Sequence, residues 1–161
     1  MANQNPQPEV YTTRHNFAAA ATQGTADTQT VFTNQATNEE VRIYAVSVSI
    51  LDSGGVDTGV DTNDFSIQTR IGNGLVPFTR YDAGLIHQKT DKTLTFATPM
   101  LVLFQQPLSV TVAWENSQVT NAEVTVVVSF HAELSLQPVA CHKCGTMYPR
   151  NSGCPVCRRE V

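Results

Sequence analysis

Apolar and polar side chains alternate along several short segments of this chain, and this period of two limits the possible folds more than any other feature. Successive side chains of a β-strand point to opposite faces of a sheet, so every second residue is buried. The residues that share one face in each segment are Tyr44/Val46/Val48/Ile50, Phe65/Ile67/Thr69/Ile71, Leu94/Phe96, Leu108/Val110/Val112/Trp114 and Val124/Val126/Val128/Phe130. The segments lie at spacings of about 8–15 residues, with no helical period between them. The pattern predicts a mainly β fold, an antiparallel β-sandwich or jelly roll of about seven or eight strands.

The rest of the sequence suggests three units. Residues 1–28 are expected to form an N-terminal arm, because the segment opens with a polar stretch that contains Pro6 and Pro8. Residues 29–138 hold the predicted sandwich. Residues 139–161 form a separate small module, which contains every cysteine of the chain.

The sequence argues against two classes of protein, those that span a membrane and those that are secreted. Charged residues make up 15% of the chain, against roughly 25% in a typical globular protein. No apolar run approaches the roughly 20 residues of a membrane span, so no membrane partner is expected. The segment Met1–Pro6 has neither a basic start nor an apolar stretch, so it is not expected to be a secretion signal. We therefore expect the chain to be made in a cytoplasm, where paired cysteines favour a metal over a disulfide.

The cysteines form two Cys-x-x-Cys pairs separated by nine residues. These four predicted metal ligands are Cys141, Cys144, Cys154 and Cys157. Four thiolates in this arrangement are the ligand set of a tetrahedral structural zinc ion, with iron as the less favoured alternative. Haem attachment requires a histidine directly after a pair, but Gly145 and Arg158 occupy those positions. A module of about twenty residues has almost no core, so metal binding is expected to supply its folding energy.

This motif resembles the zinc-ribbon and rubredoxin-like knuckles, and the resemblance covers residues 141–157. Gly145 suits the positive φ of such a knuckle, and Pro155 pre-sets the turn of the second pair. Arg158 departs from the pattern, because a glycine is common at that position. The resemblance implies a structural role for the metal.

The charge is distributed unevenly. Residues 1–140 carry six Lys/Arg and thirteen Asp/Glu, a balance of −7, whereas residues 141–161 carry four against one, a balance of +3. Four thiolates with one divalent cation would reduce the latter to about +1. A nucleic-acid partner is not expected, because the acidic body would repel phosphate.

The remaining candidate sites have weaker signals. The loop that contains Asp57, Asp61, Asn63 and Asp64 offers oxygen ligands for calcium, but its spacing does not match an EF-hand, so an ordinary solvated turn is favoured. The histidines lack the His-x-His pair of a cupin-type metal site. No catalytic motif links a nucleophile to a histidine, so the chain is expected not to be an enzyme.

The texture of residues 29–136 resembles sandwich proteins of bacteriophage virions, such as capsid decoration (cement) proteins and other head or tail accessory proteins. The segment Val31–Thr33, the turn after it, the strand Val41–Ser49 and the region Leu94–Trp114 carry this resemblance. It implies a non-enzymatic structural protein in the virion, assembled in the host cytoplasm, that binds capsid or other virion proteins and forms a homo-oligomer.

Two other classes remain open at this point. One is a cellular, cytoplasmic adaptor that uses a zinc ribbon to bind protein or nucleic acid. It predicts that Arg158 and Arg159 contribute to a salt-dependent interaction. The other is a carbohydrate-binding or hydrolytic sandwich, which predicts a glycan on an exposed aromatic face.

Overall fold

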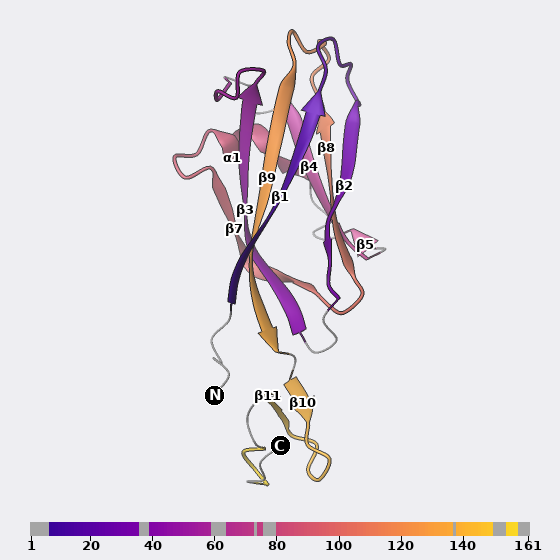
Figure 1. Cartoon of the computed structure of the whole chain (residues 1–161), viewed down its shortest axis with the longest axis vertical. Coiled ribbons are helices and arrows are strands. Elements are labelled where there is room, and N and C mark those ends of the chain that lie inside the picture. The colour runs from indigo at the N-terminus through magenta and orange to yellow at the C-terminus, as the bar shows by residue number, and fades with distance from the viewer. Residues whose placement is uncertain are drawn as a thin grey trace.

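The computed structural model describes residues 7–35, 39–58, 64–72, 74–75, 80–136, 138–149 and 154–157. Within these ranges the chain forms antiparallel strands and one short helix (Figure 1). In chain order the elements are β1 (Gln7–Phe17), β2 (Ala26–Thr33), β3 (Glu39–Asp52), β4 (Phe65–Ile71), β5 (Gly74–Leu75), β6 (Tyr81–Asp82), α1 (Ala83–His87), β7 (Thr93–Val102), β8 (Pro107–Trp114), β9 (Val124–Leu136), β10 (Pro138–Ala140) and β11 (Met147–Pro149).

The body consists of two antiparallel sheets. The first has the strand order β1-β9-β3-β7, and the second has the order β2-β8-β4-β5, with β6 also paired to β4. The described strand pairs are all antiparallel. Buried apolar side chains from both sheets form one core cluster. The predicted mainly β, antiparallel sandwich is therefore confirmed.

The alternation expected from the sequence is confirmed in β4, β8 and β9. The buried residues at the predicted inward positions are Phe65, Ile67, Thr69 and Ile71 in β4, Leu108, Val110, Val112 and Trp114 in β8, and Val126, Val128 and Phe130 in β9. Burying a large aliphatic or aromatic side chain stabilises a fold by about 1.5–3 kcal/mol. These three strands therefore supply much of the energy that holds the sheets together.

A bulge in β3 corrects the predicted face of Tyr44. The pairing of β3 with both neighbouring strands shifts between Ile43 and Ala45, which leaves Tyr44 as an extra residue. An extra residue reverses the side-chain parity on one side of a bulge relative to the other. Val46 and every second residue after it to Ile50 are buried as predicted, but Tyr44 is 36% exposed and Ile43 faces the core instead.

The expected N-terminal arm is also corrected, because residues 7–17 form a full strand of the first sheet. Strand β1 pairs with β9 along its whole length and ends with Phe17 opposite Val124. Phe17 is 2% exposed, and β2 already begins at Ala26. The inward positions of β1 include the polar residues Thr13 and His15, so the apolar alternation that identifies a strand is missing from the sequence. Residues 1–6 lie outside the described part.

The only helix in the described ranges is short. Asp82 caps α1, since its side chain accepts a hydrogen bond from the Leu85 amide at 3.0 Å. With five residues, α1 is far from the length that a membrane-spanning helix needs, and no other described segment forms such a helix.

The C-terminal residues form a small unit beyond the end of β9. Strands β10 and β11 pair only with each other in the described part and make a two-stranded sheet at one end of the molecule (Figure 1). One residue, 137, separates β9 from β10. The division into domains at residues 138 and 139 remains a prediction, and it falls at the start of β10.

Candidate metal centre

The four cysteines of the motif converge at one point. Their sulfur atoms all lie within 4.8 Å of one another. The Sγ–Sγ distance is 3.7 Å between Cys141 and Cys157 and 3.5 Å between Cys144 and Cys154. Four sulfurs at 2.3 Å from a central ion would be separated by about 3.8 Å, whereas a disulfide brings two sulfurs to about 2.05 Å. The spacing therefore fits a tetrahedral S₄ site, and all four thiols are free of disulfides.

The first pair is positioned by the turn that follows β10. The Gly145 amide donates to the Cys141 carbonyl at 2.8 Å, and the Cys141 amide donates to the Thr146 carbonyl at 3.0 Å. Gly145 has a φ of +71°, a backbone conformation that residues with a Cβ atom rarely adopt. The glycine expected from the sequence to complete this knuckle is therefore required by the backbone.

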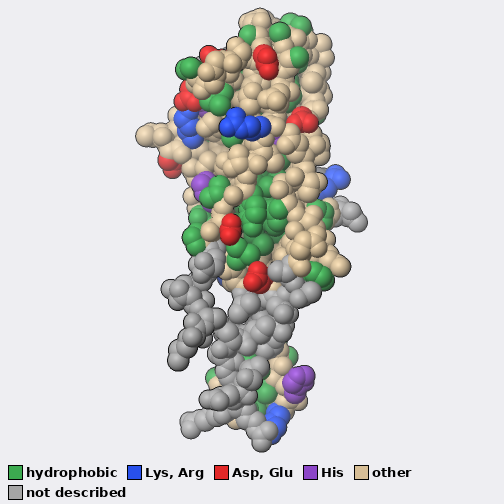
Figure 2. Space-filling view, in the orientation of Figure 1, with side chains coloured by type: hydrophobic (Ala, Val, Ile, Leu, Met, Phe, Trp, Pro, Cys, Tyr) green, Lys and Arg blue, Asp and Glu red, His purple; other side chains and the backbone are tan. Residues whose placement is uncertain are grey.

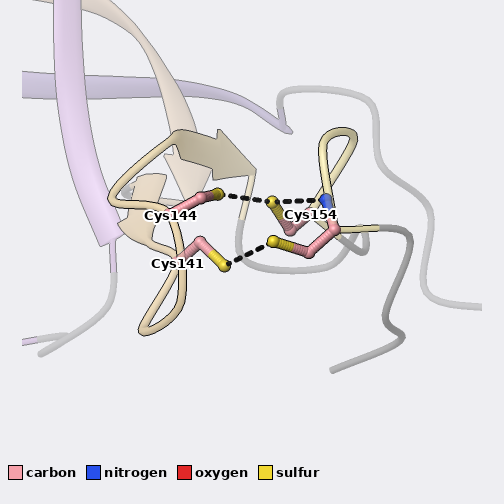
Figure 3. A group of neighbouring side chains, drawn as sticks. Cys141, Cys144 and Cys154 are labelled. Atoms are coloured by element: carbon pink, nitrogen blue, oxygen red, sulfur yellow. Dashed lines mark hydrogen bonds between the residues drawn. The ribbon is translucent and has the colours of Figure 1, made fainter.

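The second pair approaches from the opposite side. In Figure 3, Cys154 faces Cys141 and Cys144 across the centre of the cluster. The Cys157 amide points at the Cys154 sulfur at 3.5 Å. Cys154 is buried at 3% exposure, whereas Cys144 is exposed. Residues 150–153, which include Gly153, lie outside the described part.

The thiols influence one another's ionisation in opposite directions. Contacts of Cys144 with the Thr146 hydroxyl, 3.2 Å away, and with the Thr146 amide lower the pKa of Cys144 to about 6. Hydrogen bonds with the sulfurs of Cys144 and Cys141 raise the pKa of Cys157 to about 12. Four thiolates at these distances need a cation to compensate their charge.

The donor set fits a single metal ion. Tetrahedral sulfur sites take zinc or iron, and all four ligands are protein side chains, which leaves no open position for a substrate. His142 is exposed and is not part of the cluster. The arrangement therefore suits a closed structural site formed by the four predicted ligands.

The carboxylates of the loop before β4 do not form a comparable group in the described residues. Asp57 forms an ion pair with Lys92, and Asp64 accepts a hydrogen bond from the Asn116 side chain at 2.8 Å. Asp61 and Asn63 lie outside the described ranges. Among the residues that the structure describes, only the four cysteines form a group of three or more His, Cys, Asp or Glu side chains that could hold a metal ion.

The structure also brings together a polar group that sequence reasoning missed. His15 Nδ1 lies 2.8 Å from Asp27 Oδ2, and His15 Nε2 lies 3.0 Å from Thr13 Oγ1. The order Thr-His-Asp has the connectivity of a catalytic triad, but His15 is 0% exposed and Thr13 is 7% exposed. A substrate therefore cannot reach the hydroxyl, and the group joins β1 of the first sheet to β2 of the second. The sequence held one signal for this group: His15 lies two residues before the buried Phe17, so the two side chains share one face of a strand.

Solved structures similar to this chain include two phage capsid structures. No family model matches the chain, and no curated protein matches it. The capsid asymmetric unit of cyanophage Pam1 is similar at a TM-score of 0.47 and 17% identity, covering 83% of this chain and 89% of that one. The acidic stable capsid structure of Helicobacter pylori bacteriophage KHP30 is similar at a TM-score of 0.41 and 14% identity, covering 81% and 98%. Both are phage capsid structures, the class that the sequence resembled. Because the identities are below 25% and the TM-scores below 0.5, the function has to be argued from this chain's own residues.

Proposed function

We propose that this chain is a non-enzymatic structural protein of a bacteriophage virion, which binds and stabilises a capsid as a decoration or cement protein or joins another head or tail assembly. The strand order carries the proposal. The order β1-β9-β3-β7 in one sheet and β2-β8-β4-β5 in the other supports a jelly roll of two Greek keys, an architecture used repeatedly in viral capsid domains.

The outer faces of the sheets support a role in protein contacts. Hydroxyl groups pair across neighbouring strands, Thr12 with Ser129 at 2.9 Å in the first sheet and Thr28 with Thr111 at 2.8 Å in the second. Paired hydroxyls already satisfy part of their hydrogen-bonding capacity, so covering them with another protein costs little. The acidic body does not favour a nucleic-acid partner.

A non-enzymatic role is part of the proposal, and neither the cleft beside Tyr81 nor the Thr-His-Asp group favours an enzyme. The cleft lined by Phe65, Ser66, Arg80, Tyr81, Asp82 and Glu115 has a volume of about 310 Å³. In this cleft Glu115 accepts hydrogen bonds from both Ser66 and Arg80. The Thr-His-Asp group is buried, as described above.

Jelly rolls also occur in lectins, so a carbohydrate ligand has to be weighed. A glycan platform requires exposed aromatic rings. Among the large hydrophobic side chains that are exposed in the described part, the only aromatic one is Tyr44, at 36%. No observation therefore favours the carbohydrate-binding alternative over the assembly role.

The cysteine centre has a structural role in this proposal. We propose that it binds Zn²⁺ through Cys141, Cys144, Cys154 and Cys157 and thereby folds the C-terminal module. In the part of the module that is described, two strands of three residues each provide almost no core. The metal would replace the missing hydrophobic stabilisation.

The virion role is tested by the protein content of purified particles. Particles made by the genome that encodes this chain are washed in high salt and analysed by mass spectrometry, with a non-structural protein of the same genome as control. We expect the chain to remain at a fixed ratio to the major shell protein while the control is removed. A chain that is abundant in the lysate but absent from washed particles would refute the proposal.

A further inference from the structure

A hydrophobic seam lies between the edge strands of the two sheets. Tyr11 of β1 and Phe32 of β2 stack with ring centroids 4.1 Å apart, and Val31 lies beside Phe32. All three are partly buried against the core, so each still presents part of its surface. Figure 2 shows a hydrophobic area in the middle of the visible face, on the side where β1 and β2 run in Figure 1. This seam, defined by Tyr11, Val31 and Phe32, is apolar surface that the rest of the chain covers only in part.

The seam has an acidic border. Glu9 lies two residues before Tyr11 on β1, and after burial the negative charges of Glu9 and Glu39 contribute to raising the pKa of Tyr11. Glu133 is exposed on β9 opposite Pro8, at the same end of the sheet. Acidic side chains also lie beside the hydrophobic area in Figure 2. A partner for this surface would combine apolar contacts with positive charge.

The C-terminal module has that combination. Met147 is 59% exposed and Val156 is 65% exposed, although the module is very small. Lys143 is exposed between the first two cysteines, and the segment from residue 141 onward has more basic than acidic residues. Two large apolar side chains are thus exposed on a module with almost no core, and Lys143 adds a cation, which matches the apolar and acidic character of the seam.

The module cannot reach the seam of its own chain. Tyr11 pairs with Phe130, six residues before the end of β9 at Leu136, and six strand residues span about 20 Å. Only one residue separates β9 from β10, which leaves no length of chain to fold the module back over that distance. In Figure 1 the module extends beyond the end of the sheets.

We propose that the cysteine module of one copy docks, through Met147, Val156 and Lys143, onto the seam of Tyr11, Val31 and Phe32 in a second copy. The opposite charges of the body and the module support this choice of partner. Different surfaces of each copy would take part, so repetition of the contact builds a ring or an open chain. The inference is independent of the virion role, because it concerns the contact between copies and not the contact with a shell.

The test measures self-association of the purified, metal-loaded full chain by sedimentation velocity over a range of concentrations. We expect the wild-type chain to associate and the double substitution Met147→Ser/Val156→Ser to raise the dissociation constant about tenfold or more. The matched control is Leu85→Ser, because Leu85 is 57% exposed on α1, outside both proposed surfaces, and its loss should change nothing. Metal content per chain is measured for each variant, so that loss of the centre is distinguished from loss of contact.

Charge exchange provides the second measurement. Lys143→Glu in one preparation, or Glu9→Lys with Glu39→Lys in another, should each weaken association, and mixing the two preparations should restore it because opposite charges face each other again.

A wild-type chain that stays monomeric at its highest soluble concentration would overturn the proposal, as would an oligomer that the module variants leave intact. A monomer that still binds to particles would refute the docking contact and leave the virion role standing.

Discussion

At the scale of single residues, the least expected feature is the buried histidine between the sheets. His15 is fully buried, with Asp27 on one ring nitrogen and Thr13 on the other. Both contacts suit a neutral imidazole that donates to the carboxylate and accepts from the hydroxyl. Gln29 also donates to the same Asp27 oxygen at 2.7 Å. This polar group links β1 of the first sheet to β2 of the second.

The buried histidine makes stability depend on pH. Burial lowers the pKa of His15 below its ordinary value of about 6.5, and this outweighs the opposing effect of Asp27. The unfolded chain therefore binds a proton at a higher pH than the folded chain. Its contribution to stability is complete above pH 6.5 and is lost as the pH falls from there towards the native pKa.

We expect the melting temperature to fall with pH in that range, and the fall to be smaller in His15→Gln. Differential scanning calorimetry from pH 7.5 to about 4.5 measures it. The control is His131→Gln, which removes a partly buried histidine that contacts Ser47 on the outer face. Equal slopes for the wild type and His15→Gln would contradict this role.

At the scale of elements, β1 is the strand that could not be predicted from its own residues. Its polar residues Thr13 and His15 interrupt the apolar pattern, and its pairing partner β9 lies more than 100 residues later. Strand β9 alternates regularly and could be predicted from its own residues. The two strands share one ladder, but only one of them has a local signal.

The burial of Phe17 indicates that β1 is an integral strand of the sandwich and not a free arm. Phe17 is 2% exposed and contacts Phe65 across the core, with ring centroids 5.0 Å apart. Phe17→Ala should lower the free energy of unfolding by about 3–5 kcal/mol, because it removes a buried ring and leaves a cavity. Val10→Ala in the same strand is the control, since Val10 is 57% exposed and its change should stay within about 0.5 kcal/mol. Urea denaturation measures both, and similar values for the two variants would contradict an integral β1.

The cysteine module is the second element with its own prediction. Cys144→Ser or a strong chelator should release the metal and disorder the residues after about 138, because the two short strands cannot fold without it. Amide hydrogen exchange should show rapid exchange in β10 and β11 and unchanged protection in β4, β8 and β9. Ser53→Ala, a substitution on an exposed turn of the body, serves as the control. An ordered C-terminus after complete removal of the metal would refute the metal-dependent folding.

At the scale of the whole molecule, the chain combines two different sources of stability. The sandwich is stabilised by one apolar core that both sheets share. In our proposal the small module depends on a metal, and its exposed Met147 and Val156 are left for another molecule. In the proposed contact, the acidic body of one copy would face the basic module of another, so the two opposite charges would attract each other between copies.

The sequence alone was sufficient for the properties that depend on local spacing. The period of two identified β4, β8 and β9 with their inward faces, and the two Cys-x-x-Cys pairs identified the four sulfurs that converge. Only the tertiary structure decided that β1 joins the first sheet, that Tyr44 turns outward at a bulge, and that His15 reaches Asp27. Each of these depends on partners distant in the chain, because hydrogen-bond pairing and burial are properties of the neighbours that a residue acquires on folding.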